Sequence, residues 1–171
     1  MPAPIQTKPL RVTAEPDTLS LFWVDNVAII VWHSTPNAVA VQGLYELSSA
    51  KRVQFPTGMS VIHIGRVQLA MMDAAARDVF VSTLRELKGY MAATAIVSPA
   101  NGFWASTLRS VATGILVLAR VPHEIRFHER VEDVMEWLPA RHREVTGVHV
   151  EAERLREQLA HAALLARATG S

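Results

Sequence analysis

The chain of 171 residues contains no cysteine, and only 6% of its residues are aromatic and 19% are charged. The absence of cysteine excludes disulfides, thiolate metal sites and cysteine nucleophiles. The 17 basic and 16 acidic residues leave a net charge of +1, which gives the protein as a whole no electrostatic reason to bind nucleic acid or an anionic membrane. No uninterrupted apolar run reaches about 20 residues, the length that an integral membrane helix needs.

Apolar sequence is abundant, since half of the residues are hydrophobic. This proportion argues against disorder over most of the chain, and the length favours one domain with its own core. The first residues differ, because they contain Pro2, Pro4, Pro9 and Pro16 and lack the apolar segment of a secretory signal. We therefore expect residues 1–16 to form a flexible arm and the protein to be cytoplasmic and bacterial.

Short apolar stretches between polar turns predict the strands. The pair Asp25-Asn26 between two β-branched stretches is typical of a β-hairpin. Two later stretches are continuously apolar, as expected of central strands covered on both faces, and the last one alternates. The predicted strands are residues 18–24, 27–33, 59–65, 92–97 and 124–128.

Apolar residues at helical spacing, together with capping residues, predict the helices. We expect Ser34 or Thr35 to cap the first helix, Asp73 the second and Asn101 the third. Pro139 is expected to end the fourth. The predicted helices are residues 36–52, 74–90, 102–120, 131–138 and 148–168.

The resulting order, β-β-α-β-α-β-α-β-α with one extra C-terminal helix, predicts an α/β fold with a mixed five-stranded sheet. This order resembles the STAS domain of bacterial anti-sigma-factor antagonists, stressosome proteins and the cytoplasmic tails of sulfate transporters. The segment from His123 to Leu138, a strand followed by a short acidic helix and Trp-Leu, is similar to the branch related to SpoIIAA and to Sec14-type lipid-binding modules. On this likeness, residues 17–140 form the STAS-like domain and residues 147–169 an appended amphipathic helix.

The resemblance implies a non-catalytic regulatory module that docks a protein partner. The antagonists carry an Asp-Ser or Asp-Thr pair at the junction between the third strand and the second helix, and a partner kinase phosphorylates that Ser or Thr. This sequence has no Ser or Thr between Ser60 and Ser82, so the switch residue has no counterpart here. We expect an interaction module without that phospho-switch, and Sec14-like kinship leaves a small-ligand or lipid-binding domain as the alternative.

Polar residues that follow the predicted strands are the candidate ligand-binding residues, because open α/β sheets bind ligands at the carboxyl ends of their strands. A small anion there would meet a basic side chain and a helix N-terminus, although helix capping explains the Ser and Asn residues equally well. These candidates are His33, Ser34, Arg66, Ser98 and Asn101.

An enzyme would rest only on His33 and His63, because the sequence contains no nucleophile elbow, phosphate loop, dinucleotide fingerprint or zinc-protease motif. Burial in or beside an apolar strand is the commoner role for such histidines. We therefore expect no catalytic residues, no metal and no cofactor.

The C-terminal helix carries apolar residues at heptad spacing between Val148 and Ala166. Such a pattern predicts either docking on the helix's own domain or a short coiled coil between subunits. The first strand is apolar on both faces, so a helix of the same chain, the N-terminal arm or a second subunit must cover it. We expect a homodimer, and the candidate residues for contact between subunits or with a partner are Leu155, Leu159, Ala162 and Trp23.

Overall fold

The computed structural model describes residues 17–65, 71–98 and 103–168. At its centre lies a five-stranded sheet in which the spatial order of the strands follows the chain. The strands are β1 (Leu19–Val24), β2 (Val27–Trp32), β3 (Met59–Ile64), β4 (Met91–Val97) and β5 (Glu124–His128).

The sheet is mixed, because β1 pairs antiparallel with β2 and every later strand runs parallel to β2. The hairpin turn is Asp25-Asn26, and Asp25 has a positive φ of 52°. The predicted α/β class, mixed sheet and hairpin are therefore confirmed.

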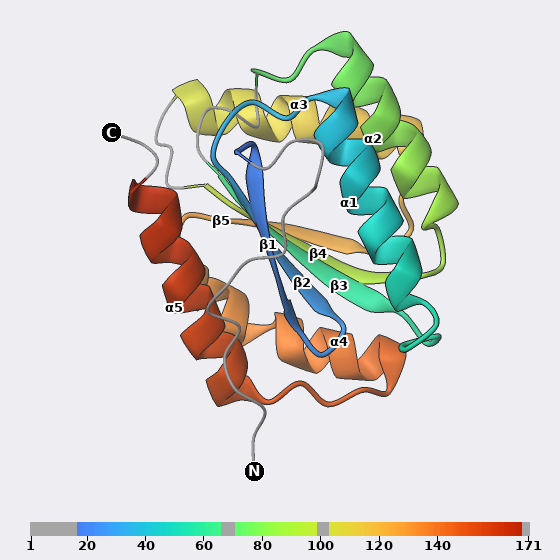
Figure 1. Cartoon of the computed structure of the whole chain (residues 1–171), viewed down its shortest axis with the longest axis vertical. Coiled ribbons are helices and arrows are strands. Elements are labelled where there is room, and N and C mark those ends of the chain that lie inside the picture. The colour runs from blue at the N-terminus through green and yellow to red at the C-terminus, as the bar shows by residue number, and fades with distance from the viewer. Residues whose placement is uncertain (1–16, 66–70, 99–102, 169–171) are drawn as a thin grey trace.

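Helices cover both faces of the sheet and give the molecule three layers (Figure 1). One face carries α1 (Ala38–Lys51), α2 (Ala74–Glu86) and α3 (Phe103–Ala119). The opposite face carries the 3-10 helix η2 (Val131–Glu136), α4 (Leu138–Thr146) and α5 (Ala152–Ala168).

The cap of α1 lies further along the chain than the sequence predicted. The side-chain oxygen of Asn37 accepts a hydrogen bond from the backbone N of Ala40 at 2.9 Å. The prediction of Ser34 or Thr35 as the cap is wrong, because neither residue stands immediately before the first helical turn, where a short side chain reaches an unpaired N–H.

The other caps were predicted with mixed success. Asp73 caps α2 as expected, since its Oδ1 accepts a hydrogen bond from the N of Ala76 at 2.8 Å. Asn101 lies outside the described residues. Pro139 was expected to end a helix, but it stands in the first turn of α4, where the missing N–H of proline breaks no helical bond. The predicted domain boundary at residue 140 consequently falls inside α4.

Side chains of β1 alternate between the two cores. Leu19, Leu21 and Trp23 belong to the core beneath α1, whereas Phe22 and Val24 belong to the core beneath α5. Trp23 is buried at 7% exposure, with Lys51 Nζ 4.9 Å from the centre of its ring. Helices of the same chain therefore cover this strand, and Trp23 does not offer a surface to a second subunit.

Helix α5 docks on its own domain, which is one of the two arrangements that heptad spacing allowed. Leu155, Leu159 and Ala162 are buried in the core formed with β2 and η2. Arg154 Nη1 lies 3.1 Å from Asp25 Oδ1 and ties the helix to the hairpin turn. These apolar side chains cannot form a surface between subunits, and α5 is part of the domain rather than an appendage.

A buried hydrogen-bond network joins α4 to the sheet through His142. Its Nδ1 lies 2.8 Å from Ser60 Oγ at the start of β3, and its Nε2 lies 2.8 Å from Asn26 Oδ1 in the hairpin turn. Asn26 Nδ2 donates to the carbonyl oxygen of Gly58 at 2.7 Å. Asn26, Ser60 and His142 are each fully buried. The network satisfies polar groups that would otherwise be costly to bury.

The network also fixes the protonation of His142. Because the amide nitrogen of Asn26 donates to Gly58, its oxygen must accept, and the imidazole must donate from Nε2. Nδ1 is then the acceptor of the Ser60 hydroxyl hydrogen. Burial lowers the pKa of His142 to about 4, so the imidazole is neutral at neutral pH.

This burial predicts a stability that decreases with acid. Burial holds the pKa values of His63, His123 and His142 at about 4, whereas an unfolded histidine titrates near 6.5. Below pH 6.5 the unfolded chain therefore binds more protons, and the free energy of unfolding decreases as the pH decreases toward 4. His142 accounts for about 1.5 kcal/mol of this loss between pH 6.5 and 5.

Urea denaturation of the wild type and of His142→Gln across this pH range measures the effect. The variant is expected to be less stable at pH 7. Its free energy of unfolding should also change less with pH, because its unfolding takes up about one proton fewer than that of the wild type. His149→Gln is the matched control, because His149 is exposed. A pH dependence in His142→Gln as steep as that of the wild type would contradict the assignment.

Candidate functional site

The predicted ligand-binding residues do not converge in the described part of the chain. His33 Nε2 lies 2.8 Å from Ser20 Oγ on β1, and Ser34 is exposed beside it. Ser98 is buried at the end of β4, and its backbone N donates to the carbonyl oxygen of His128. Since β3 separates β2 from β4, the ends of those strands are about 10 Å apart. The other two candidates, Arg66 and Asn101, lie outside the described residues.

The Ser60–His142–Asn26 network has the order of a hydrolase triad, in which a hydroxyl bonds to an imidazole that is held by a third side chain. All three residues have no exposed surface, and the network lies at the amino ends of the parallel strands. A substrate cannot reach the hydroxyl of Ser60. The arrangement therefore serves as a structural connection between α4, the hairpin turn and β3.

A cavity of about 90 Å³ lies between the sheet and the helices α2 and α3. The described residues of its walls are apolar except for His63 and Thr94. The lining side chains come from β3 (His63), β4 (Met91, Thr94, Ile96), β5 (Ile125), α2 (Phe80, Leu84), the residue before its cap (Met72) and α3 (Leu108, Val111, Ala112, Ile115, Leu116).

The ring of His63 is held by aromatic neighbours. Trp32 Nε1 donates a hydrogen bond to His63 Nδ1 at 3.2 Å, and the two rings are nearly parallel, with centroids 6.3 Å apart. Phe80 meets the imidazole edge-on at 6.2 Å. Burial lowers the pKa of His63 to about 4. Because Nδ1 accepts from Trp32, the hydrogen of the neutral imidazole is on Nε2.

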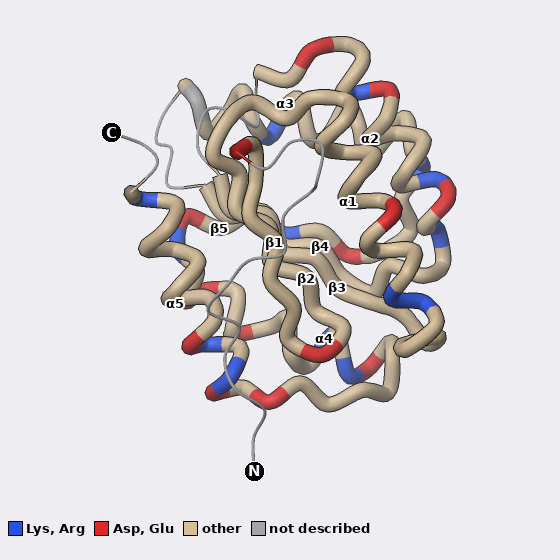
Figure 2. The backbone as a smooth tube through the Cα atoms, in the orientation of Figure 1, with Lys and Arg blue, Asp and Glu red and all other residues tan. Residues whose placement is uncertain are grey.

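The outer face of α3 is exposed and uncharged. The helix has a single charged residue, Arg109, in 17 residues, and Figure 2 shows it as an almost uniformly tan tube. Phe103, Val117 and Leu118 are exposed by 74%, 69% and 61%. Exposed helical faces of monomeric proteins usually carry charges, so this face is a candidate contact surface.

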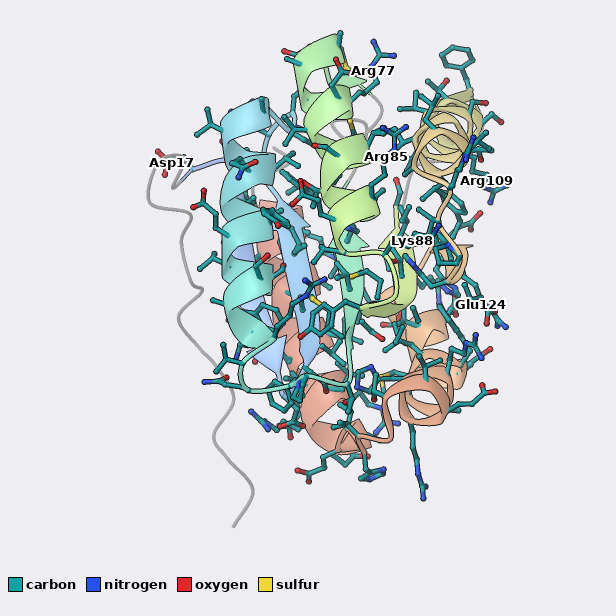
Figure 3. All side chains as sticks on the ribbon, turned by 90° about the vertical axis from the view of Figure 1, so that its right-hand side faces the viewer. Asp17, Arg77, Arg85, Lys88, Arg109 and Glu124 are labelled. Carbon is teal, nitrogen blue, oxygen red and sulfur yellow. The ribbon has the colours of Figure 1, made fainter. Side chains whose placement is uncertain are left out.

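A groove of about 320 Å³ runs along this surface, between α2 and α3. Its lining includes Val81 from α2 and Gly114 and Leu118 from α3, and a Cβ atom added at Gly114 would meet no other atom within 4 Å. Arg85 Nη2 donates to the carbonyl oxygen of Leu118 at 2.8 Å and fixes the end of α3 against α2. Arg77 and Asp78 of α2 are the charged residues among the described residues that line the groove, and Figure 3 also labels Arg85, Lys88 and Arg109 on this side of the molecule.

The apolar spacing of α3 predicts that Leu108, Ile115 and Leu118 face inward, and the structure confirms this for Leu108 and Ile115. The prediction is wrong for Leu118, which is exposed by 61%. Sequence reasoning missed the outer surface, although the residues away from the stripe are small or apolar: Phe103, Ser106, Ser110, Gly114 and Val117. The cavity gave no such signal, since its walls come from five separate elements.

Comparison of the chain with protein families, with curated proteins and with solved structures finds no match. In the described ranges, no helix has both the length and the apolar character needed to cross a membrane. Nor does that part of the chain group three or more metal-ligating side chains.

The hydrogen bond from Trp32 predicts the state of His63 in solution. We expect a neutral imidazole with its hydrogen on Nε2 at pH 7 and still neutral at pH 5.5, because its pKa is about 4. Long-range ¹H–¹⁵N spectra of the imidazole distinguish the two tautomers and the charged form. Trp32→Phe removes the donor, so the Nδ1-protonated tautomer becomes populated in that variant. A wild-type ring that carries its hydrogen on Nδ1, or is charged at pH 5.5, contradicts the structure.

Proposed function

We propose that this chain is a non-catalytic, STAS-like regulatory module that acts through protein contact and forms a homodimer through the outer face of α3. The observation that carries the proposal is the uncharged exposed surface with Phe103, Val117 and Leu118. The sequential mixed sheet, with α1 to α3 on one face, supports the STAS-like assignment.

The face of α3 is complementary to itself. Phe103 and Leu118 are equally far along α3 from the point between Ser110 and Val111, so a two-fold axis there brings Phe103 of one copy to Leu118 of the other. Ser110 and Gly114 lie near the crossing, where small side chains let two helices approach closely. Within α3 the only charged residue is Arg109.

The placement of the histidines supports a non-catalytic role. His33 pairs with Ser20, His63 with Trp32 and His142 with Ser60 and Asn26. Each of these rings makes a hydrogen bond to a neighbouring element. A nucleophile and its base would instead have to meet where a substrate can approach.

The alternative of a lipid-binding domain is less well supported. The apolar cavity has a volume of about 90 Å³, roughly that of three water molecules in the liquid. A lipid acyl chain with its headgroup needs several times this space. The volume therefore favours the interaction module over a lipid carrier.

Sedimentation velocity of the full chain, from micromolar to near-millimolar concentration, tests the dimer. The wild type is expected to shift from monomer to dimer as the concentration rises. Leu118→Glu should weaken dimerisation at least about tenfold, because a carboxylate would be buried in the contact without a partner.

Leu164→Glu provides the matched control, since Leu164 is a leucine of 63% exposure on α5, on the opposite face of the sheet. It should dimerise like the wild type, and circular dichroism should report an unchanged fold for both variants. A wild type that stays monomeric throughout, or equal weakening by both substitutions, would overturn the proposed contact.

A further inference from the structure

The cavity beneath α3 and the groove beside α2 share Val111 and Ile115 in their linings. Leu108, Ala112 and Leu116 of α3 line the cavity alone, and the most exposed residues of the proposed dimer contact, Phe103 and Val117, line neither. An inference about the cavity therefore does not depend on the dimer.

The size and walls of the cavity limit what it holds. The cavity is open on one side, and its volume of about 90 Å³, smaller than the roughly 150 Å³ of a dry apolar cavity that binds benzene, suits a compact apolar body. Water is a poor occupant, because it needs two to four polar partners. Among the described residues, the polar side chains in the lining are His63 and Thr94, and the Thr94 hydroxyl lies 2.9 Å from His123 Nε2.

His63 gives the cavity one directed hydrogen-bond donor. Its Nδ1 is turned toward Trp32 on β2, whereas the other lining residues of the sheet belong to β4 and β5, on the opposite side of β3. The two ring nitrogens point to opposite sides of the imidazole, so the Nε2–H is directed toward the cavity. Within the described part of the chain, no protein group accepts a hydrogen bond from Nε2.

We propose that this cavity is a binding site for a small uncharged molecule with a compact apolar body and one carbonyl-type oxygen, which accepts a hydrogen bond from His63 Nε2. The apolar walls exclude ions, because a charge placed there would lose its hydration without gaining a partner of opposite charge. The aromatic neighbours Trp32 and Phe80 hold the donor in place before the ligand arrives.

Two probes of the same shape isolate the hydrogen bond. In 2-methyl-1-butene, a methylene group replaces the carbonyl oxygen of 2-butanone. Each is titrated into the full chain labelled at the methyl groups of methionine and isoleucine. Saturable shifts are expected at Met72, Met91, Ile96 and Ile115, which line the cavity, together with a shift of the His63 Nε2–H for the ketone only.

His63→Phe keeps a ring in this position and removes the donor. Relative to the wild type, the ratio of ketone affinity to alkene affinity should fall by about threefold to tenfold, the worth of one hydrogen bond. Continued binding of the alkene shows that the cavity persists in the variant. An unchanged ratio would overturn the role of His63.

Ala112→Leu fills the cavity and should abolish the binding of both probes, and the smaller Ala112→Val should weaken it. The matched control is Ala160→Leu, on the exposed surface of α5, which should bind both probes like the wild type. The site is refuted if the lining methyl groups show no saturable shift in the wild type, or if Ala112→Val and Ala112→Leu, both folded, bind as well as Ala160→Leu.

Discussion

One buried imidazole, neutral at neutral pH, connects three separate parts of the fold. His142 joins α4 to the hairpin turn and to the start of β3, two segments that are 34 residues apart in the chain, as the numbers of Asn26 and Ser60 show. Its neutral form supplies one donor and one acceptor, which match Asn26 and Ser60. Gly58 completes the network, and its φ of +133°, with the Tyr90 carbonyl oxygen 2.9 Å from where a Cβ would lie, excludes any other residue. Protonation of His142 would break the network at its centre.

The two helical layers differ in how tightly they cover the sheet. Large side chains such as Leu138, Leu155 and Leu159 fill the space beneath α4 and α5. Beneath α2 and α3, by contrast, a cavity remains next to His63, and a groove separates the helices on the outside. The closely packed layer thus holds the polar network, whereas the other layer contains the cavity and the groove.

The sequence predicted what is local. The Asp25-Asn26 turn and the Asp73 cap depend on neighbouring residues, and both were found. Pro139 was misread because proline both ends helices and occupies their first turn, and only the packing of α4 decides between these roles. Heptad spacing in α5 could not reveal whether Leu155 meets its own sheet or another copy. His63 could not be assigned as a donor from sequence, because its partner Trp32 lies on a different strand.

The position of α5 also determines when the first two strands can be covered during synthesis. The last helix of the domain packs against its first two strands, with His161 edge-on to Phe22 at 5.5 Å and Arg154 paired with Asp25. While the chain is still attached to the ribosome, Phe22 and Ile29 have no cover on that face until the residues of α5 have left the exit tunnel. The domain therefore closes only after α5 has been made, and until then this apolar face of the first two strands is exposed.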